Sequence, residues 1–238
     1  MKKAIIIGAT SGIGKELAKI LVKENFKVGI TGRRNHYLEE LANEQPDRYI
    51  ASCFDVTNCI QTEQKLNELI EDLQGLDLLI ICAGTGELNE SLALSIEQET
   101  IDVNILGFTT AATIAFHYFM QKGRGHLVGI SSIAAIRGNR YAPAYSASKA
   151  FQSNYLEALR GKARKLQLDI HITDIQPGFV ATKMVKAKDA FWIAPVEKAA
   201  KQIYKAIGRK DKKKYITRRW ALIALLLKIT PSWLYEKL

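Results

Sequence analysis

The fold is decided by residues 4–14, which read Ala-Ile-Ile-Ile-Gly-Ala-Thr-Ser-Gly-Ile-Gly. The apolar run is typical of a strand that is covered on both faces of a parallel sheet. The glycines after it permit a tight turn, and the N–H groups at the start of the next helix can meet a negatively charged pyrophosphate. The spacing is G-x-x-x-G-x-G rather than the more common G-x-G-x-x-G. The stretch therefore predicts a dinucleotide-binding turn or, as the alternative, a purely structural connection from strand to helix.

Apolar strand patterns alternate with amphipathic helix patterns along the rest of the chain. The predicted strands cover 3–7, 27–31, 49–54, 77–82, 126–131, 168–175 and 214–217. The predicted helices cover 12–25, 35–44, 58–73, 96–121, 143–165 and 195–208. This alternation predicts an α/β fold, in which a parallel sheet carries helices on both faces.

Composition places the chain among ordinary globular proteins, and its 238 residues suit one domain. The start of the sequence shows no apolar signal segment with a cleavage site. Cys53, Cys59 and Cys82 do not have the spacing of a metal site. We therefore expect no metal and reduced thiols, and hence a cytoplasmic protein.

The net charge of +10 is unevenly distributed. Residues 1–197 contain 22 basic and 22 acidic side chains, whereas residues 198–238 contain 12 basic and two acidic ones. The excess positive charge therefore belongs to the final segment. It is informative about the binding partners of that segment and not about the fold.

Two arginines, Arg33 and Arg34, follow the second predicted strand, at the point where dinucleotide folds bind the adenosine ribose. An acidic residue there would bind the 2′-hydroxyl of NAD, whereas a guanidinium suits the 2′-phosphate of NADP. The sequence favours NADP(H) over NAD(H). The alternative is that both are solvated charges at a helix start, a reading that fits Arg34 better than Arg33.

Tyr145 and Lys149 are one turn apart on the predicted helix 143–165, so they share a face. A cation beside a phenol lowers the pKa of the phenol, and such a tyrosine can exchange a proton with a carbonyl or alcohol oxygen. Ser132, at the end of the preceding strand, can converge on the same sheet edge. On its own the pair also occurs by chance on solvated helices. Asn104 lies in an otherwise apolar helix, which is costly unless its amide is hydrogen-bonded.

Taken together, residues 3–208 resemble the short-chain dehydrogenase/reductase family. The resemblance implies a Rossmann-type three-layer αβα sandwich with a doubly wound, seven-stranded parallel sheet in the order 3-2-1-4-5-6-7. It implies one domain over residues 1–208, holding the cofactor and substrate sites together, and an extension over 209–238 that is not an independent domain. We also expect a homo-oligomer, but the glycine-rich closing strand that the family uses in tetramer contacts is absent, so the oligomeric state is not carried over from the resemblance.

The resemblance also implies roles for individual residues. Asn104, Ser132, Tyr145 and Lys149 match the catalytic tetrad: Tyr145 gives the proton, Lys149 lowers its pKa, Ser132 binds the substrate oxygen and Asn104 holds a relay water. The expected cofactor contacts are Gly8, Thr10, Ser11, Gly12, Ile13, Gly14, Arg33, Arg34, Asp55, Val56, Ala83, Gly84, Tyr145, Lys149, Pro177, Gly178, Val180 and Thr182. The family's Asn-Asn-Ala-Gly reads Ile81-Cys82-Ala83-Gly84 here, which changes local detail.

The expected substrate contacts are Ser132, Tyr145, Phe179, Met184 and Trp192. Because the last three are apolar, the sequence predicts an NADPH-dependent reductase of a lipophilic ketone, such as a 3-oxoacyl compound or a keto-lipid. The alternatives are an NADP-dependent alcohol dehydrogenase working in the oxidative direction, or a non-catalytic NADP-binding sensor.

The extension has a basic run at 209–219, followed by eight apolar residues from Trp220 to Leu227. A bilayer-spanning helix needs about 20 apolar residues, so this run is too short. A basic and apolar helix with flanking Trp and Tyr fits an in-plane, peripheral membrane anchor. The alternatives are packing on the body or on a second subunit, or an acidic carrier protein; nucleic acid is less favoured.

Overall fold

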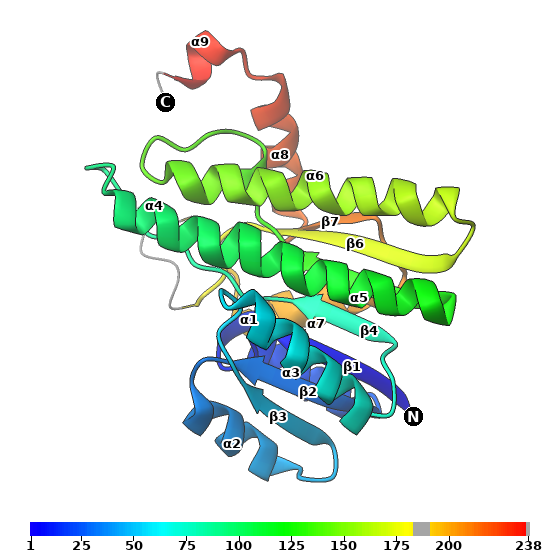
Figure 1. The fold of residues 1–238 in the computed structure, drawn as a ribbon. Coiled ribbons are helices and arrows are strands. Elements are labelled where there is room, and N and C mark those ends of the chain that lie inside the picture. Colours follow the sequence, from blue (N-terminus) through cyan, green and yellow to red (C-terminus); the bar gives the residue numbers. More distant parts are fainter. Residues whose placement is uncertain (183–190, 237–238) are drawn as a thin grey trace.

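The computed structural model describes residues 1–182 and 191–236. Their centre is one parallel sheet of seven strands in the order β3-β2-β1-β4-β5-β6-β7 (Figure 1). The strands are β1 (Lys2–Ile7), β2 (Phe26–Gly32), β3 (Tyr49–Cys53), β4 (Leu78–Ile81), β5 (Arg124–Ile130), β6 (Asp169–Pro177) and β7 (Lys213–Ile216). The predicted fold class and strand order are confirmed. The order reverses at β1, which pairs with both β2 and β4, and ligands bind at such a switch point in open α/β sheets.

The helices form a layer on each side of the sheet. One core cluster joins the sheet to α1 (Gly12–Lys23), α2 (Asn35–Glu44) and α7 (Val196–Gly208). The other joins it to α3 (Cys59–Asp72), α5 (Phe108–Lys122) and α6 (Pro143–Lys165). Alternate residues of β1 belong to different clusters, Ala4 and Ile6 to the first and Ile5 and Ile7 to the second. An unbroken apolar strand is therefore what this position in the sheet requires.

Local sequence signals account for several helix ends. Pro143 occupies the first turn of α6, where its missing N–H costs no hydrogen bond. Asn58 caps α3 by accepting a hydrogen bond from the backbone N–H of Gln61 at 3.0 Å. Gly123 ends α5 in the left-handed conformation, at φ 75°.

The predicted helix 96–121 is interrupted. It consists of α4 (Leu94–Ile101), a π-helical turn η1 (Asp102–Gly107) and then α5. Such turns are rare and are often found at functional sites, and this one contains Asn104. The whole run from Leu94 to Lys122 is long and apolar enough to cross a membrane by length and composition, but half of its apolar window is buried inside the fold. We interpret it as a core helix, since α5 packs on the sheet through Phe108 and Phe119.

The extension continues past β7 into α8 (Arg219–Ile229) and α9 (Ser232–Tyr235). These two helices stand out from the layered body near the start of α6 (Figure 1). Trp220 and Ala224 on one side of α8 are buried. Part of the extension therefore packs on the body, as one of the alternatives predicted.

Candidate active site

A cavity of about 1040 Å³ opens at the carboxyl ends of the strands. Almost all residues predicted for the two sites line it: Gly8, Thr10, Ser11, Gly12, Ile13, Gly14, Arg33, Arg34, Asp55, Val56, Ala83, Gly84, Ser132, Tyr145, Lys149, Pro177, Gly178, Phe179, Val180 and Thr182. Asn104 and Trp192 do not line it but contact residues that do. Met184 lies outside the described residues.

We call the part of the cavity around Gly8, Gly14 and Arg34 the glycine end. Gly8 has φ +91°, and a Cβ there would lie 2.7 Å from the backbone nitrogen of Ala83. A Cβ on Gly14 would lie 2.1 Å from the carbonyl oxygen of Gly8. The side chain of Ser11 caps none of the N–H groups that begin α1. The loop is therefore compact enough to bring backbone N–H groups to a bound pyrophosphate, and it fits the phosphate part of a dinucleotide.

The two arginines have different surroundings. Arg34 donates hydrogen bonds to Thr10 Oγ1 at 2.6 Å and to Ser11 Oγ at 2.9 Å, so its guanidinium lies on the glycine-rich loop. Arg33 is more than half exposed and pairs with Asp55, with Nη1 to Oδ2 at 3.6 Å. The sequence favoured Arg33 as the functional arginine. In the structure Arg34 is the one ordered against the loop, although both line the cavity.

Lys149 is buried, at 4% exposure, and lines the cavity. Its ammonium donates to the carbonyl oxygen of Ile130 at 3.1 Å and to Gln152 Oε1 at 3.0 Å, and it lies 5.7 Å from the ring centre of Tyr145. Burial lowers the pKa of Lys149 to about 8, and this shift is partly opposed by Cys82 and Asp174. Gln152 was not predicted; it ties Lys149 to the π-turn by donating to the carbonyl oxygen of Asn104 at 2.8 Å.

The pKa of Tyr145 does not follow the sequence expectation. Burial raises this pKa above its usual value, while a hydrogen bond with Ser132 acts in the opposite direction. The lysine expected to lower it is bonded to Ile130 and Gln152, so desolvation of the phenol dominates. Tyr145 therefore carries its proton at neutral pH, which is the form that can donate to an oxygen.

Asn104 is a fully hydrogen-bonded amide. Its Oδ1 accepts from the backbone N–H of Thr85 at 2.8 Å, and its Nδ2 donates to the Thr85 carbonyl at 2.7 Å and to Ser148 Oγ at 3.0 Å. These bonds explain how an amide is tolerated in the helix and fix the π-turn against α6. The water that Asn104 was expected to hold stays a prediction.

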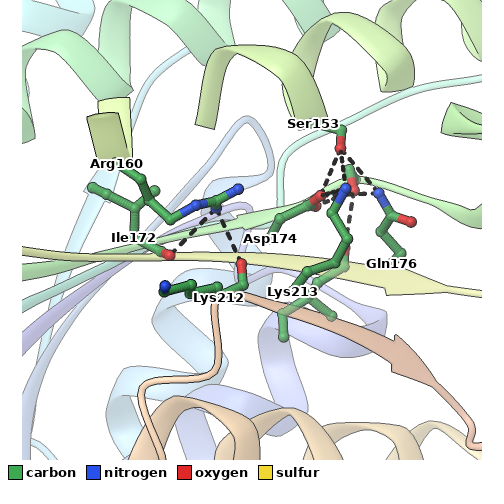
Figure 2. A network of polar contacts seen from close by, with 9 residues as sticks. Ser153, Arg160, Ile172, Asp174, Gln176, Lys212 and Lys213 are labelled. Carbon is green, nitrogen blue, oxygen red and sulfur yellow. Dashed lines mark hydrogen bonds and ion pairs between the residues drawn. The ribbon is translucent and has the colours of Figure 1, made fainter. Parts of the chain in front are cut away.

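A buried carboxylate, Asp174, lies within a network of polar contacts that includes Ser153, Gln176 and Lys213, and it was missed (Figure 2). It accepts hydrogen bonds from Ser131 Oγ, from Ser153 Oγ at 2.7 Å and from Gln176 Nε2 at 2.9 Å, and Lys213 Nζ lies 3.6 Å away. These contacts link the end of β5, α6, β6 and β7. Ser131 precedes the predicted catalytic serine, so Asp174 holds the strand end that carries it. An acidic residue inside a predicted strand was the available signal, because a buried charge needs several partners.

A second part of the cavity, which we call the aromatic end, is lined by Phe179, Trp220, Leu227 and Tyr235. The rings of Phe179 and Trp220 meet edge to face, with centres 5.5 Å apart. The indole of Trp220 lies against Gly178, where a Cβ would be 2.0 Å from the ring. Trp192 contacts Trp220 with ring centres 6.3 Å apart but lies outside the cavity lining. Three of the four lining residues come from the extension and were not predicted.

Three contacts join the extension to the loop after β5. Arg137 donates to the carbonyl oxygen of Thr230 at the end of α8, and its guanidinium lies 5.1 Å from the ring centre of Tyr235. The hydroxyl of Tyr235 donates to the carbonyl oxygen of Gly138 at 2.8 Å. The loop after β5 is therefore joined to the extension at the mouth of the aromatic end.

Within residues 1–182 and 191–236, no group of three or more His, Cys, Asp or Glu side chains is arranged to hold a metal ion. Cys82 lies within the glycine end, and burial raises the pKa of its thiol to about 12. It therefore remains a protonated, small apolar side chain at the position where the resemblance expects an asparagine.

Comparison with known proteins agrees with this geometry. A family model for short chain dehydrogenases matches residues 2–191. An oxidoreductase of Myxococcus xanthus is 31% identical over 243 aligned residues, which cover 99% of this chain and 95% of the relative.

Two solved structures share the fold at low identity. A short-chain dehydrogenase/reductase of Mycobacterium ulcerans has a TM-score of 0.84 at 20% identity and covers 100% of this chain and 98% of its own. The structure of ElxO with NADP bound has a TM-score of 0.80 at 22% identity and covers 90% of this chain and 96% of its own. The family model covers strands β1 to β6 and the switch point of the sheet, so we conclude that the chain belongs to the short-chain dehydrogenases, a family of NAD(P)-dependent oxidoreductases.

Proposed function

We propose that this chain is an NADPH-dependent reductase that converts a lipophilic ketone into a secondary alcohol. The observation that carries the proposal is the position of Tyr145 and Ser132, which line one cavity between a glycine-rich loop and a roof of aromatic side chains. A carbonyl group held there would have a proton donor and a second hydroxyl donor beside it, with apolar surface around the rest of the molecule.

The preference for NADP rests on the glycine end. Arg34 and Arg33 offer two guanidinium groups beside the loop, and within the described residues of β2 and its following turn no carboxylate takes the place that an NAD ribose would use. Asp55 and Val56 would flank the adenine, and Gly178, Val180 and Thr182 would close the opposite side. A solved relative of this fold has NADP bound, which agrees with the proposal.

Each polar residue of the site has one task in this proposal. Bound NADPH would supply the hydride that the carbonyl carbon accepts. Tyr145 donates its proton to the carbonyl oxygen, and Ser132 stabilises the charge that develops on that oxygen. The resulting phenolate is stabilised by Lys149, whose charge lies near the ring, until solvent returns a proton. Asn104 and Gln152 act indirectly, because they position Lys149.

The lipophilic substrate is inferred from the aromatic end, where Phe179, Trp220 and Leu227 offer no charge to a ligand. We further propose a cytoplasmic location, in keeping with three free thiols, and a homo-oligomeric assembly. One competing function is oxidation of an alcohol, since the same residues can bind a ketone or an alcohol. The other is a sensor that binds NADP without catalysis.

The test is NADPH oxidation by the purified chain with a series of ketones of increasing chain length, with NADH in parallel. Turnover should rise with chain length, and Tyr145→Phe should lower kcat/KM by about 10²- to 10⁴-fold, the usual contribution of a general acid. NADPH binding by Tyr145→Phe, followed by fluorescence, should be unchanged and serves as the folding control. Reduction only of small polar ketones would overturn the lipophilic substrate. Tight NADPH binding with no turnover of ketones or alcohols would favour the sensor.

A further inference from the structure

Helix α8 is apolar on two opposite sides. One side faces the body, where Trp220 and Ala224 are buried and Leu227 lines the cavity. The other side carries Leu222, Leu225, Leu226 and Ile229, whose spacing of three, four and seven residues places them along one helical stripe. These four side chains are between 47% and 66% exposed. A helix that is apolar all round is normally covered on all sides, but residues 1–182 and 191–236 leave this outer stripe exposed.

Other exposed apolar side chains belong to α9 or lie near the first turn of α8. Trp233 and Leu234 of α9 are exposed, and Phe191 and Trp192 are about half exposed beside the first turn of α8. Trp192 is connected to that turn by Arg219, whose guanidinium lies 5.7 Å from its ring centre. In Figure 1, α8 and α9 stand out from the body, which agrees with the exposure of the outer stripe. We call the stripe of α8 together with Trp233 and Leu234 the α8–α9 face.

Positive charge surrounds this face. Arg218 and Arg219 begin α8 and Lys228 lies in its last turn, and all three are exposed. They belong to the segment with 12 basic and two acidic residues, and one of those acids, Asp211, is already paired with Lys214 at 3.6 Å. A two-fold contact between two copies would place the same basic segments against one another. The charge therefore favours an anionic partner over a second copy of the chain.

We propose that the α8–α9 face docks on an anionic lipid bilayer, with α8 lying in the plane of the headgroup–acyl boundary. The outer stripe would enter the acyl region, Trp233 would lie at the headgroup level, and the arginines and Lys228 would meet lipid phosphates. At 11 residues α8 is too short to cross the bilayer, so only an in-plane position is possible.

Docking of the α8–α9 face would also affect the cavity, because the inner side of α8 contributes to the cavity wall. Leu227 and Tyr235 line the aromatic end, so docking would set the mouth of the cavity at the lipid surface. A lipophilic ketone dissolved in the bilayer could then reach the cavity without crossing water. This last step rests on the proposed function, whereas docking itself does not.

The experiment is sedimentation of the full chain with vesicles of phosphatidylcholine alone and of phosphatidylcholine mixed with phosphatidylglycerol. The chain should sediment with the anionic vesicles, less so at high salt and much less with the neutral ones. Replacing Leu225, Leu226 and Ile229 together by serine should weaken partition at least about tenfold. The matched control is Ile60→Ser, because Ile60 is 83% exposed on α3 and far from the extension in sequence. Its partition should equal that of the unaltered chain.

A second pair of variants tests the charge. Arg218→Gln, Arg219→Gln and Lys228→Gln together should weaken binding to anionic vesicles only. Lys162→Gln with Arg164→Gln, which removes exposed charge from α6, should not. Sedimentation needs no turnover, so docking and ketone reduction can fail independently.

Two outcomes would overturn the proposal. One is no sedimentation of the unaltered chain with anionic vesicles. The other is a triple-serine variant that keeps its vesicle binding but changes from dimer to monomer in analytical ultracentrifugation, because a second copy would then cover the face.

Discussion

The two ends of the cavity are built from different parts of the chain. At the glycine end the walls are backbone, and Gly8 and Gly14 lie so close to neighbouring main-chain atoms that a Cβ would collide with them. At the aromatic end the walls are side chains, and Trp220, Leu227 and Tyr235 come from a separate, later segment. A backbone wall permits almost no substitution, whereas a side-chain wall can be exchanged residue by residue. We therefore expect cofactor binding to be rigidly specified and substrate choice to be adjustable.

Lys149 lines the same cavity, and its burial predicts the largest effect. Its pKa in the folded chain is lowered to about 8 from 10.5, so between these values the unfolded chain binds a proton that the folded chain has released. Stability therefore rises with pH across this window relative to Lys149→Met, by about 3 kcal/mol at about 1.4 kcal/mol per pKa unit.

Urea denaturation of both chains at about pH 7.5 and about pH 10.5 measures this difference, because titrating groups common to both largely cancel. A difference in unfolding free energy that stays constant with pH would mean that Lys149 is not desolvated as described.

The backbone wall is tested by Gly14→Ala. A Cβ at this position meets the Gly8 carbonyl oxygen at 2.1 Å, so the loop must shift, and we expect a loss of about 1–3 kcal/mol in unfolding free energy. NADPH affinity, measured by fluorescence titration, should fall as well. The control is Gly161→Ala on α6, where a Cβ meets nothing within 4 Å and the change should stabilise the chain by about 0.5–1 kcal/mol. Normal stability and affinity in Gly14→Ala would show that the wall can move.

Substitution of each arginine tests which of the two contributes more to NADPH binding at the glycine end. Arg34→Ala should raise the Kd for NADPH about tenfold, as expected for the loss of one charge-assisted contact, and should leave the Kd for NADH nearly unchanged. Arg33→Ala should have a smaller effect, because Arg33 is exposed and already paired with Asp55. Isothermal titration of each variant with NADPH and with NADH gives four Kd values, each of which is divided by the Kd of the unaltered chain. A larger increase in the Kd for NADPH in Arg33→Ala than in Arg34→Ala would mean that Arg33 is the main phosphate ligand, as the sequence suggested.

The smallest effect is expected at the aromatic end. Tyr235→Phe keeps the ring but removes the hydrogen bond to Gly138, so the extension should be held less firmly at the mouth. KM for a long-chain ketone should rise about two- to threefold, corresponding to less than 1 kcal/mol, while kcat for a short ketone stays constant. An equal change in kcat for both ketones would mean that Tyr235 influences the chemistry rather than the mouth.

Much of the glycine end could be predicted because its requirements are local. A strand, a glycine-rich turn and a helix start follow one another within residues 2–23, and each has its own sequence signal. Tyr145 and Lys149 could be paired for the same reason, since helical spacing alone puts them on one face. The sheet order was predicted correctly, whereas the roles of the individual residues stay predictions.

The remainder depended on contacts between distant segments. The π-turn that carries Asn104 has no reliable pattern, and the direction of the Tyr145 pKa shift depends on burial that only the folded chain defines. Asp174 was visible as an acid inside a predicted strand, but its partners Ser153 and Lys213 lie on other elements. The packing of Trp220 on Gly178 could not be predicted, because neither local sequence contains a signal for a contact with the other.

That contact also limits how the sequence can vary. The indole of Trp220 occupies the volume that a side chain at position 178 would need, so the two positions cannot change independently. Among related sequences, a larger residue at the position of Gly178 should occur only where the position of Trp220 holds a small one. The pair would then mark, in an alignment, which relatives fold their final segment over the cavity in the same way as this chain.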